Sequence, residues 1–509
     1  MRLAHRSTIR AIALALAAIG ALAQAGAARG ALLQPLLDTS VVNRVPELVP
    51  LGPAGERIAI VGTFSRYGRR VGPGSYLAQD GILLAARDGS GLHTVWRTEM
   101  GLAIEGGLTA TGDGATLAWI GPRGQAYAMD THSERVHAVH GAGAPLDGFF
   151  AGPNRLYAML DYGHAARWLD AGSSRLRPLR GQGAGAHAGV AALAYVVSRS
   201  RTQLASCGAL LHRGRPAGLR LGLLDPSSAT MRYRSVAHLA MVPGSSDQTC
   251  GVSDDGSTVA TIGRAGDARY LLAMRGGRVV RIRVPRATAH VASLSPDGRL
   301  ALVGGGADLP QDVEGLTRTV MLAGSVAIVD LDSGRVSPLA LAHVAKPNPR
   351  WAGAQLSSDR AVWSADGQRL ALGASAGALL VVNTATGRPT AIRRPRPPVG
   401  FAFERDTPPR PLAFSDDGRR VVFALFDKAG DITELHPYMA PVDGSAGATY
   451  LLTRSMASFQ EVVRSADGRT AWVLPSSTCH TVYPQPLLLL AGGTLWDGPF
   501  EQPTDPNAP

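Results

Sequence analysis

The fold is decided by the stretch Ser295-Pro296-Asp297-Gly298-Arg299-Leu300-Ala301-Leu302-Val303, a short polar segment followed by apolar residues. Serine and aspartate side chains accept hydrogen bonds from nearby backbone amides, and glycine tolerates a positive φ. The first four residues therefore favour a tight turn, while the residues after them suit a pleated, buried surface. The stretch predicts a turn that leads directly into a β-strand.

The same pattern recurs along the chain. Its clear copies are Ser253-Asp254-Asp255-Gly256, Ser364-Ala365-Asp366-Gly367, Ser415-Asp416-Asp417-Gly418 and Ser465-Ala466-Asp467-Gly468. Repetition at intervals of roughly 40 to 70 residues is typical of an architecture in which each repeat is one supersecondary unit.

A second turn pattern alternates with the first. An apolar strand that ends at Asp330 leads into Asp332-Ser333-Gly334-Arg335, and related turns lie at residues 130–135, 170–175 and 383–388. A further short strand precedes each turn of the first kind. Each unit is therefore predicted to be a four-stranded antiparallel meander of about 50 residues, the blade of a β-propeller.

The fold expected is all-β, a single β-propeller of four-stranded antiparallel blades. Nine units can be counted, two of which match poorly, so we predict eight blades, with seven or nine as alternatives. The propeller is expected over residues 49–498, after a signal peptide (1–25) and a lead-in segment (26–48), and before a C-terminal tail (499–509).

The Ser-Pro-Asp-Gly turn with its small apolar strand resembles the WD-like repeat of the TolB-like propellers. The resemblance covers the chain from Val49 to Trp496 and implies a β-propeller fold. The same repeat occurs in the propeller domains of prolyl-oligopeptidase-like peptidases. The chain departs from both families, because it lacks the α/β domain of TolB proteins and the α/β-hydrolase domain of the peptidases. Docking onto the Tol envelope complex is therefore not carried over, nor is peptidase activity.

The N-terminus has the pattern of a secretory signal peptide. Arg2, Arg6 and Arg10 precede an apolar run, Ala11–Ala23, that is shorter than the ~20 residues needed to span a bilayer. Small residues up to Ala25 then suit cleavage, and an uncleaved anchor is the alternative. The mature protein is expected to be periplasmic or secreted, with no later transmembrane segment, and nucleic acid is not an expected partner.

The net charge is +12, and about +9 remains without the leader. The excess is almost entirely arginine, and two basic stretches also carry aromatic residues. We predict that they bind a protein or an acidic component of the envelope, because arginine binds carboxylate and phosphate groups bidentately and stacks on rings. The alternative is that they are solvated loops in an arginine-rich proteome. The predicted binding residues are Arg66, Tyr67, Arg69, Arg70, Arg393, Arg394, Arg396 and Phe401.

Long connections are expected on one face of the disc. In a four-stranded meander the first and third connections lie on one face, and the second connection and the link to the next blade lie on the other. The tight turns are the first and third connections here. The long connections predicted for the opposite face are residues 62–80, 304–322, 339–355, 392–410 and 425–437.

Three cysteines, Cys207, Cys250 and Cys479, remain in the mature chain. In an oxidising compartment Cys207 and Cys250, the nearest pair in sequence, are the candidates for a disulfide bond, which leaves one thiol over. The alternative is that all three are small buried apolar residues.

Motifs of catalysis are missing from the sequence. It has no Gly-x-Ser-x-Gly elbow, no glycine-rich phosphate loop with lysine and no Cys-x-x-Cys. The closest approach to a metal site is His132, Glu134, His137 and His140, but residues 137 and 140 of a strand point to opposite faces. We therefore predict no catalytic residue, no metal and no cofactor. The function expected is that of a non-enzymatic scaffold; the alternative is a hydrolase or lyase with its active site at the channel mouth.

Overall fold

The structure is a computed structural model of the chain. In some strands only the backbone is described. The residues described are 33–35, 44–52, 55–70, 76–99, 102, 104–161, 164–180, 190–198, 202–212, 215–242, 250–310, 317–322, 325–339, 355–357, 361–374, 378–395, 408–415, 417–429, 432–451, 459–464, 471–475 and 488–490.

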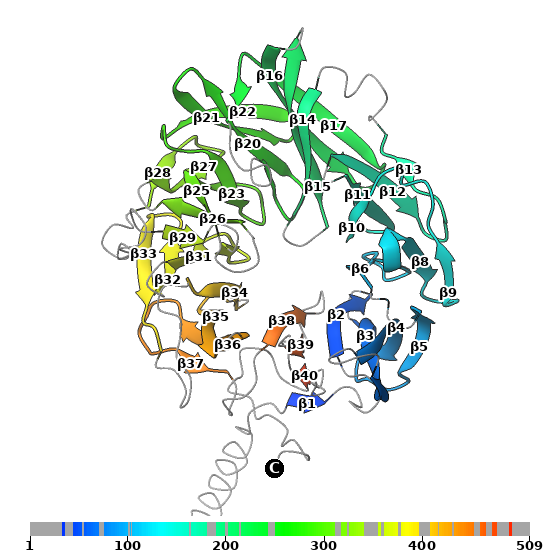
Figure 1. The fold of residues 1–509 in the computed structure, drawn as a ribbon. Helices are drawn as coiled ribbons and strands as arrows, with labels where there is room; N and C mark the ends of the chain where they lie inside the picture. The colour runs from blue at the N-terminus through cyan, green and yellow to red at the C-terminus, as the bar shows by residue number, and fades with distance from the viewer. Residues whose placement is uncertain are drawn as a thin grey trace, which may run out of the picture.

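Nine antiparallel sheets form from the described residues: seven of four strands, one of five and one of seven. Figure 1 shows them following one another in chain order around a ring. The predicted all-β propeller with four-stranded antiparallel blades is confirmed. The described part of the chain has nine sheets, which equals the number of repeat units counted in the sequence. Nine was one of the two alternatives given to eight blades.

The first five sheets are, in chain order, β2 (Arg44–Leu51), β3 (Arg57–Arg70), β4 (Tyr76–Ala86), β5 (His93–Arg97); β6 (Gly106–Ala110), β7 (Thr116–Ile120), β8 (Ala126–Asp130), β9 (Arg135–Ala138); β10 (Leu146–Ala151), β11 (Arg155–Leu160), β12 (Ala165–Asp170), β13 (Arg177–Pro178); β14 (Val190–Val197), β15 (Leu204–His212), β16 (Arg215–Asp225), β17 (Thr230–Ala237); and β18 (Ala240–Met241), β19 (Cys250–Val252), β20 (Thr258–Ala265), β21 (Ala268–Arg275), β22 (Arg278–Val284). A short 3-10 turn, η2 (Pro122–Gly124), joins β7 to β8.

The remaining sheets are β23 (His290–Leu294), β24 (Leu300–Gly304), β27 (Ala327–Asp330), β28 (Val336–Pro338); β25 (Gly306–Pro310), β26 (Thr317–Leu322), β29 (Gln355–Ser357), β30 (Val362–Trp363), β31 (Arg369–Ala374), β32 (Ala378–Asn383), β33 (Arg388–Ile392); β34 (Arg410–Phe414), β35 (Arg420–Ala429), β36 (Ile432–Pro441), β37 (Thr449–Tyr450); and β38 (Phe459–Arg464), β39 (Ala471–Pro475), β40 (Leu488–Leu490) with β1 (Leu33–Pro35).

The ninth sheet contains both ends of the described chain. Its strand order is β1-β40-β39-β38, and Leu33 pairs with Leu490 in the antiparallel ladder. Figure 1 shows β1 beside β40. Within residues 26–48, the segment expected to lead into the propeller, the structure has β1 and the first residues of β2, which begins at Arg44. Neither strand is introduced by one of the repeat turns from which the boundary was inferred.

Two of the predicted long connections are strand pairs instead of loops. Strands β3 and β4 continue pairing beyond the core as far as Arg70 and Tyr76, and β35 and β36 pair out to Ala429 and Ile432. The extension satisfies backbone N–H and C=O groups within the hairpin itself. The connection predicted at residues 304–322 likewise contains the hairpin β25–β26, which joins the seventh sheet because β26 pairs with β29.

Apolar layers between neighbouring sheets form the core. One such layer joins Ala59 and Leu84 of the first sheet to Leu117 and Trp119 of the second, all of which are buried. A sheet with a neighbour on both sides has two buried faces, so its inner strands are predominantly apolar on both faces. Strand β7, Thr-Leu-Ala-Trp-Ile, is buried throughout.

The repeat turns have one hydrogen-bond pattern. In the sixth sheet the Ser295 hydroxyl donates to Asp297 Oδ1 over 2.6 Å and accepts from the backbone amide of Leu300 over 2.8 Å. Gly298 has a φ of +65°. The turns at Ser253, Ser364 and Ser415 form the same pair of bonds. The predicted role of serine and aspartate in closing these turns is confirmed.

Candidate functional site

The tight turns of consecutive sheets contact one another. The amides of Gly112 and Asp113 in the second sheet donate to the carbonyls of Gly152 and Pro153 in the third, over 2.9 and 3.1 Å. The amide of Asp255 in the fifth sheet donates to Pro296 O in the sixth over 3.1 Å. These contacts place the first turns of neighbouring sheets on one face, which we call the tight-turn face.

The opposite face receives the connections between second and third strands and the links from one sheet to the next. This follows from the antiparallel order within each sheet, because strands that start at the tight-turn face must end at the other. We call this second surface the long-loop face. The β3–β4 hairpin extends from it, and so does the segment that follows β33.

The structure assigns the predicted binding residues to this face as far as they are described. The backbone of Arg66, Tyr67, Arg69 and Arg70 belongs to the outer part of β3, and their side chains lie outside the described part of the chain.

The second basic stretch begins directly after β33. Arg393 is exposed and Arg394 is half-buried. Arg396 and Phe401 lie outside the described residues. Both stretches therefore leave their sheets at the same face, since β3 is a second strand and β33 a fourth strand and these run in the same direction within a blade.

Two of the four candidate metal residues, Glu134 and His137, contact neighbouring sheets. The Glu134 carboxylate accepts from Arg57 Nη2 over 3.0 Å and lies 2.9 Å from His93 Nε2. His137 Nε2 lies 2.8 Å from the carbonyl oxygen of Ser173 in the third sheet. A search of the described residues finds no group of three or more His, Cys, Asp or Glu arranged to hold a metal ion.

His93 and Glu134 each shift the pKa of the other. The pKa of Glu134 is lowered, chiefly by the hydrogen bond from His93 and to a smaller extent by the positive charges of His93 and Arg57. Desolvation of the carboxylate opposes this shift. In return, the hydrogen bond to the Gly91 carbonyl, and then the one to Glu134, raise the pKa of His93. The arrangement joins the first and second sheets and explains why these polar residues lie where they do.

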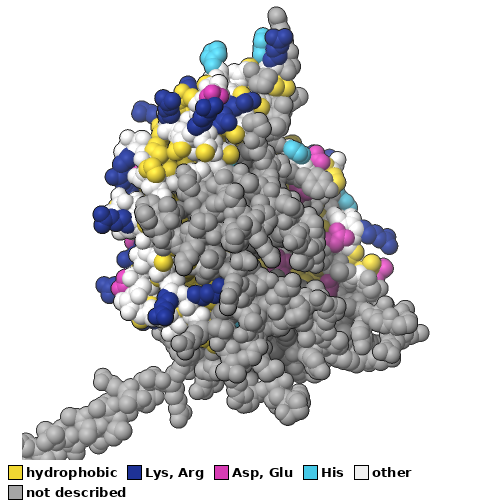
Figure 2. Space-filling model, turned by 60° about the vertical axis from the view of Figure 1, so that its left-hand side comes forward, with side chains coloured by type: hydrophobic (Ala, Val, Ile, Leu, Met, Phe, Trp, Pro, Cys, Tyr) yellow, Lys and Arg dark blue, Asp and Glu magenta, His cyan; other side chains and the backbone are white. Residues whose placement is uncertain are grey.

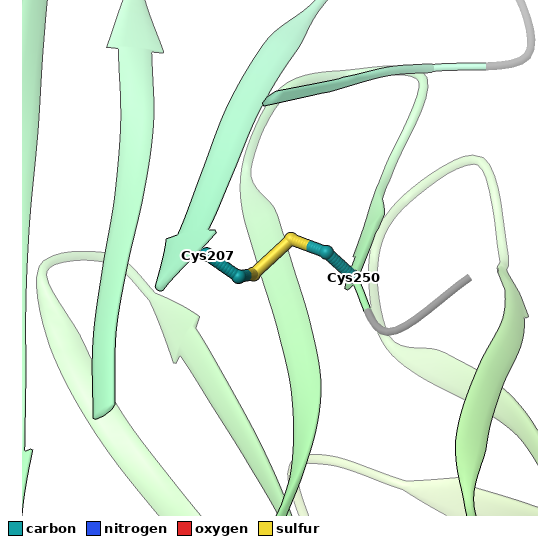
Figure 3. The surroundings of a disulfide bond; sticks show 2 residues. All are labelled: Cys207 and Cys250. Carbon is teal, nitrogen blue, oxygen red and sulfur yellow. A yellow bond between two sulfur atoms is a disulfide. The ribbon is translucent and has the colours of Figure 1, made fainter. Parts of the chain in front are cut away.

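A disulfide bond links the fourth and fifth sheets. Cys207 of β15 and Cys250 of β19 are bonded, with their Cα atoms 6.0 Å apart, as Figure 3 shows. Both residues are buried in the apolar layer between the two sheets. The pairing proposed from the sequence is confirmed, and Cys479 lies outside the described residues.

A second basic surface, not predicted from the sequence, lies on the outer strands of the fourth and fifth sheets. Arg232 and Arg234 of β17, and Arg281 and Arg283 of β22, are all exposed. Figure 2 shows Lys and Arg side chains gathered at the upper part of the described surface, over the sheets at the top of Figure 1. The signal in the sequence was arginine at alternating positions, which puts both side chains on one face of a strand.

Comparison with known proteins gives structural likenesses alone. No family model matches the chain, and no curated protein matches it. One solved structure that resembles it is the Dos1 propeller, with 11% sequence identity and a TM-score of 0.39 over 77% of this chain and 92% of that chain. Another is the β-propeller domain of Cps50 (Swd1) from Myceliophteria thermophila, with 13% identity and a TM-score of 0.31 over 77% of this chain and 96% of that chain. The tricorn protease also resembles it, with 11% identity and a TM-score of 0.29 over 86% of this chain and 43% of that chain.

No helix in the described part of the chain is long and apolar enough to cross a membrane.

Proposed function

We propose that this protein is an exported, TolB-like β-propeller that acts as a non-enzymatic binding scaffold of the bacterial cell envelope. Its partner is a protein or another acidic component of the envelope, which docks on the long-loop face. The observation that carries the proposal is that β3, which contains Arg66–Arg70, and β33, which ends just before Arg393, both run toward this one face. We expect the arginines of the two stretches to supply positive charge to a shared surface.

The tight-turn face is poorly suited to selective binding. Its turns repeat one hydrogen-bond pattern, in which the serine hydroxyl and the aspartate carboxylate are already used within the turn. Function in repeat folds tends to collect where the connections differ from one repeat to the next. The long-loop face has such connections, including the extended β3–β4 hairpin.

Export is supported by the leader-like N-terminus and by the Cys207–Cys250 disulfide, because structural disulfides persist in oxidising compartments. Cell fractionation with mass spectrometry of the mature N-terminus tests this part of the proposal. A chain that begins near residue 26 and is recovered from the periplasm or medium is expected. Recovery of the full-length chain from the cytoplasm would refute export.

Binding at the long-loop face is tested by reversing charge at Arg69, Arg70, Arg394 and Arg396 together. The tagged protein is used to capture partners from envelope extracts, and affinity for the captured partner is then measured at low and high salt. We expect the quadruple Arg→Glu variant to bind more weakly, and wild-type binding to weaken as salt rises, because exposed charges are screened over about 10 Å at 0.1 M ionic strength.

The matched control reverses four arginines on the tight-turn side of the ring: Arg135, Arg175, Arg335 and Arg419, all exposed. Its net charge equals that of the first variant, so a general charge effect would weaken both equally. Both variants are expected to stay within about 0.5 kcal/mol of wild-type stability. Equal partner binding by wild type and the long-loop variant would remove the function assigned to this face.

A further inference from the structure

Strand β22 has an unusually accessible outer edge. It pairs with β21 along seven residues without a register shift, and the described residues place no strand against its other side. An open edge of this kind presents unpaired N–H and C=O groups that can accept another strand.

Other outermost strands of the ring are blocked or short. Strands β13, β28, β33 and β1 each contain proline, which cannot donate to a ladder. Strand β37 has two residues, β9 has four, and β5 has five and pairs with β4 through a register shift. The outer strand of the fourth sheet, β17, is long, but Arg180 covers its start: the Met231 amide donates to Arg180 O over 3.0 Å. β22 combines length, continuous pairing and a sequence rich in valine and isoleucine, which favours strand pairing.

The two sides of β22 differ in chemistry. Val280 and Ile282 pack in the layer between the fifth and sixth sheets, whereas Val279 packs in the layer shared with the fourth. Since side chains alternate along a strand, Arg281 and Arg283 project on the same side as Val279. The strand therefore presents arginine on one side of its edge and apolar residues on the other.

Charge near this edge is positive. The guanidinium of Arg281 lies 3.8 Å from the centre of the Tyr270 ring. On the facing side of the fourth sheet, Arg234 donates from Nε to Gly277 O over 2.9 Å. Arg234, Arg281 and Arg283 do not take part in any ion pair found among the described residues. Arg234 is already held by its bonds to the carbonyls of Gly277 and Tyr233, so Arg281 and Arg283 supply the two guanidinium groups that we expect a partner to contact.

We propose that the open edge of β22 pairs with an extended segment of a partner protein in which acidic and apolar side chains alternate. In such a segment, side chains on one side repeat about every 7 Å, which is also the spacing between Arg281 and Arg283 along β22. The acidic side chains lie next to the arginines, and the apolar ones extend the layer of Val280 and Ile282. Backbone hydrogen bonds supply affinity, and the alternating pattern supplies selectivity.

The arginines also disfavour self-association. Two copies of β22 paired antiparallel about Arg281 would place like charges opposite each other, which is destabilising. The same charges favour an acidic strand. This surface is distinct from the long-loop face, so its test succeeds or fails independently of the proposed docking there.

The test uses fluorescence anisotropy with the purified mature protein and a labelled peptide of alternating glutamate and valine. A peptide of alternating glutamate and proline, equal in charge and also extended, cannot enter a ladder and is the control. We expect the first peptide to bind and the second to bind at least roughly tenfold more weakly. Equal binding of both peptides would show a general polyanion surface and overturn strand pairing, and so would no binding of the first.

Substitutions in β22 test whether the peptide binds at this edge. Arg281→Glu/Arg283→Glu is expected to weaken binding of the glutamate–valine peptide roughly tenfold or more, because two attractive cross-strand pairs become repulsive. Arg335→Glu/Arg388→Glu, which changes two exposed arginines elsewhere on the ring, carries the same charge and should bind as wild type. Circular dichroism monitors folding, and Arg281→Gln/Arg283→Gln provides a milder change of intermediate effect. Unchanged binding by the glutamate and glutamine variants would refute the assignment to β22.

Discussion

The Cys207–Cys250 disulfide is expected to be a major contribution to stability. It joins residues separated by 43 positions in the chain and located in different sheets. Cross-linking a loop of this size restricts the unfolded chain by an entropy that corresponds to about 4 kcal/mol at 25 °C. Replacement by Cys207→Ala/Cys250→Ala should therefore lower the free energy of unfolding by about that amount.

The assay has two stages. Alkylation of the denatured protein without reductant, followed by mass spectrometry, should label one thiol of the three, and all three after reduction. Urea unfolding then compares wild type, the double variant and Cys479→Ala, which keeps the disulfide. The double variant should unfold at a clearly lower urea concentration, and reductant should lower the wild-type midpoint to a similar value.

Two results would refute the reasoning. Labelling of all three thiols without reductant would show that the bond is absent from the protein. An intact bond whose removal leaves the urea midpoint unchanged would show that the fourth and fifth sheets restrict each other equally well through their apolar layer.

Three further predictions concern the turns and the contact between the first two sheets. Ser295→Ala should lower the free energy of unfolding by about 1–3 kcal/mol in urea titrations, because the buried Leu300 amide loses its acceptor. Hydrogen bonds from Ser364, and then from the Gln368 amide, hold the pKa of Asp366 below its usual value. The stability contributed by the Asp366 carboxylate is present above about pH 4 and is lost as pH falls through the lowered pKa. The free energy of unfolding of Asp366→Asn, measured in urea at several pH values, should therefore fall less in acid than that of wild type. NMR titration should find the pKa of His93 raised, because of its bonds to Gly91 O and Glu134. That stabilisation is present below about pH 6.5 and is lost as pH rises through the raised pKa; an unchanged His93 titration in Glu134→Gln would contradict the contact.

Local chemistry explains what could be predicted from the sequence. The Ser-x-Asp-Gly turns close through bonds between residues at most five positions apart, such as Ser295 and Leu300, so the pattern is visible in any short window. The alternation of two turn types then fixed the order of strands, and with it the two faces. The disulfide followed from the proximity of Cys207 and Cys250 in the sequence.

Pairings between distant segments explain what could not be predicted. Nothing in Leu33–Pro35 indicates that it pairs with Leu488–Leu490, and no turn signal marks the hairpin β25–β26 as part of the seventh sheet. The arginines of β22 were visible, but their significance depends on which side of the strand faces the fourth sheet. That side became known from the packing of Val279 and Val280.

The sheet that contains both β1 and β40 determines when the protein can finish folding. Leu33 emerges from the ribosome early, yet its partner Leu490 is made 457 residues later. The earlier sheets contain neighbouring segments and can assemble while synthesis or translocation continues, whereas the ninth must wait. Until then β1 has no partner and β40 is absent, and a chain interrupted before residue 488 keeps an incomplete last sheet. The ring can therefore close only after the chain has been made as far as β40, and a protease that attacks exposed strands would selectively degrade chains that stop earlier.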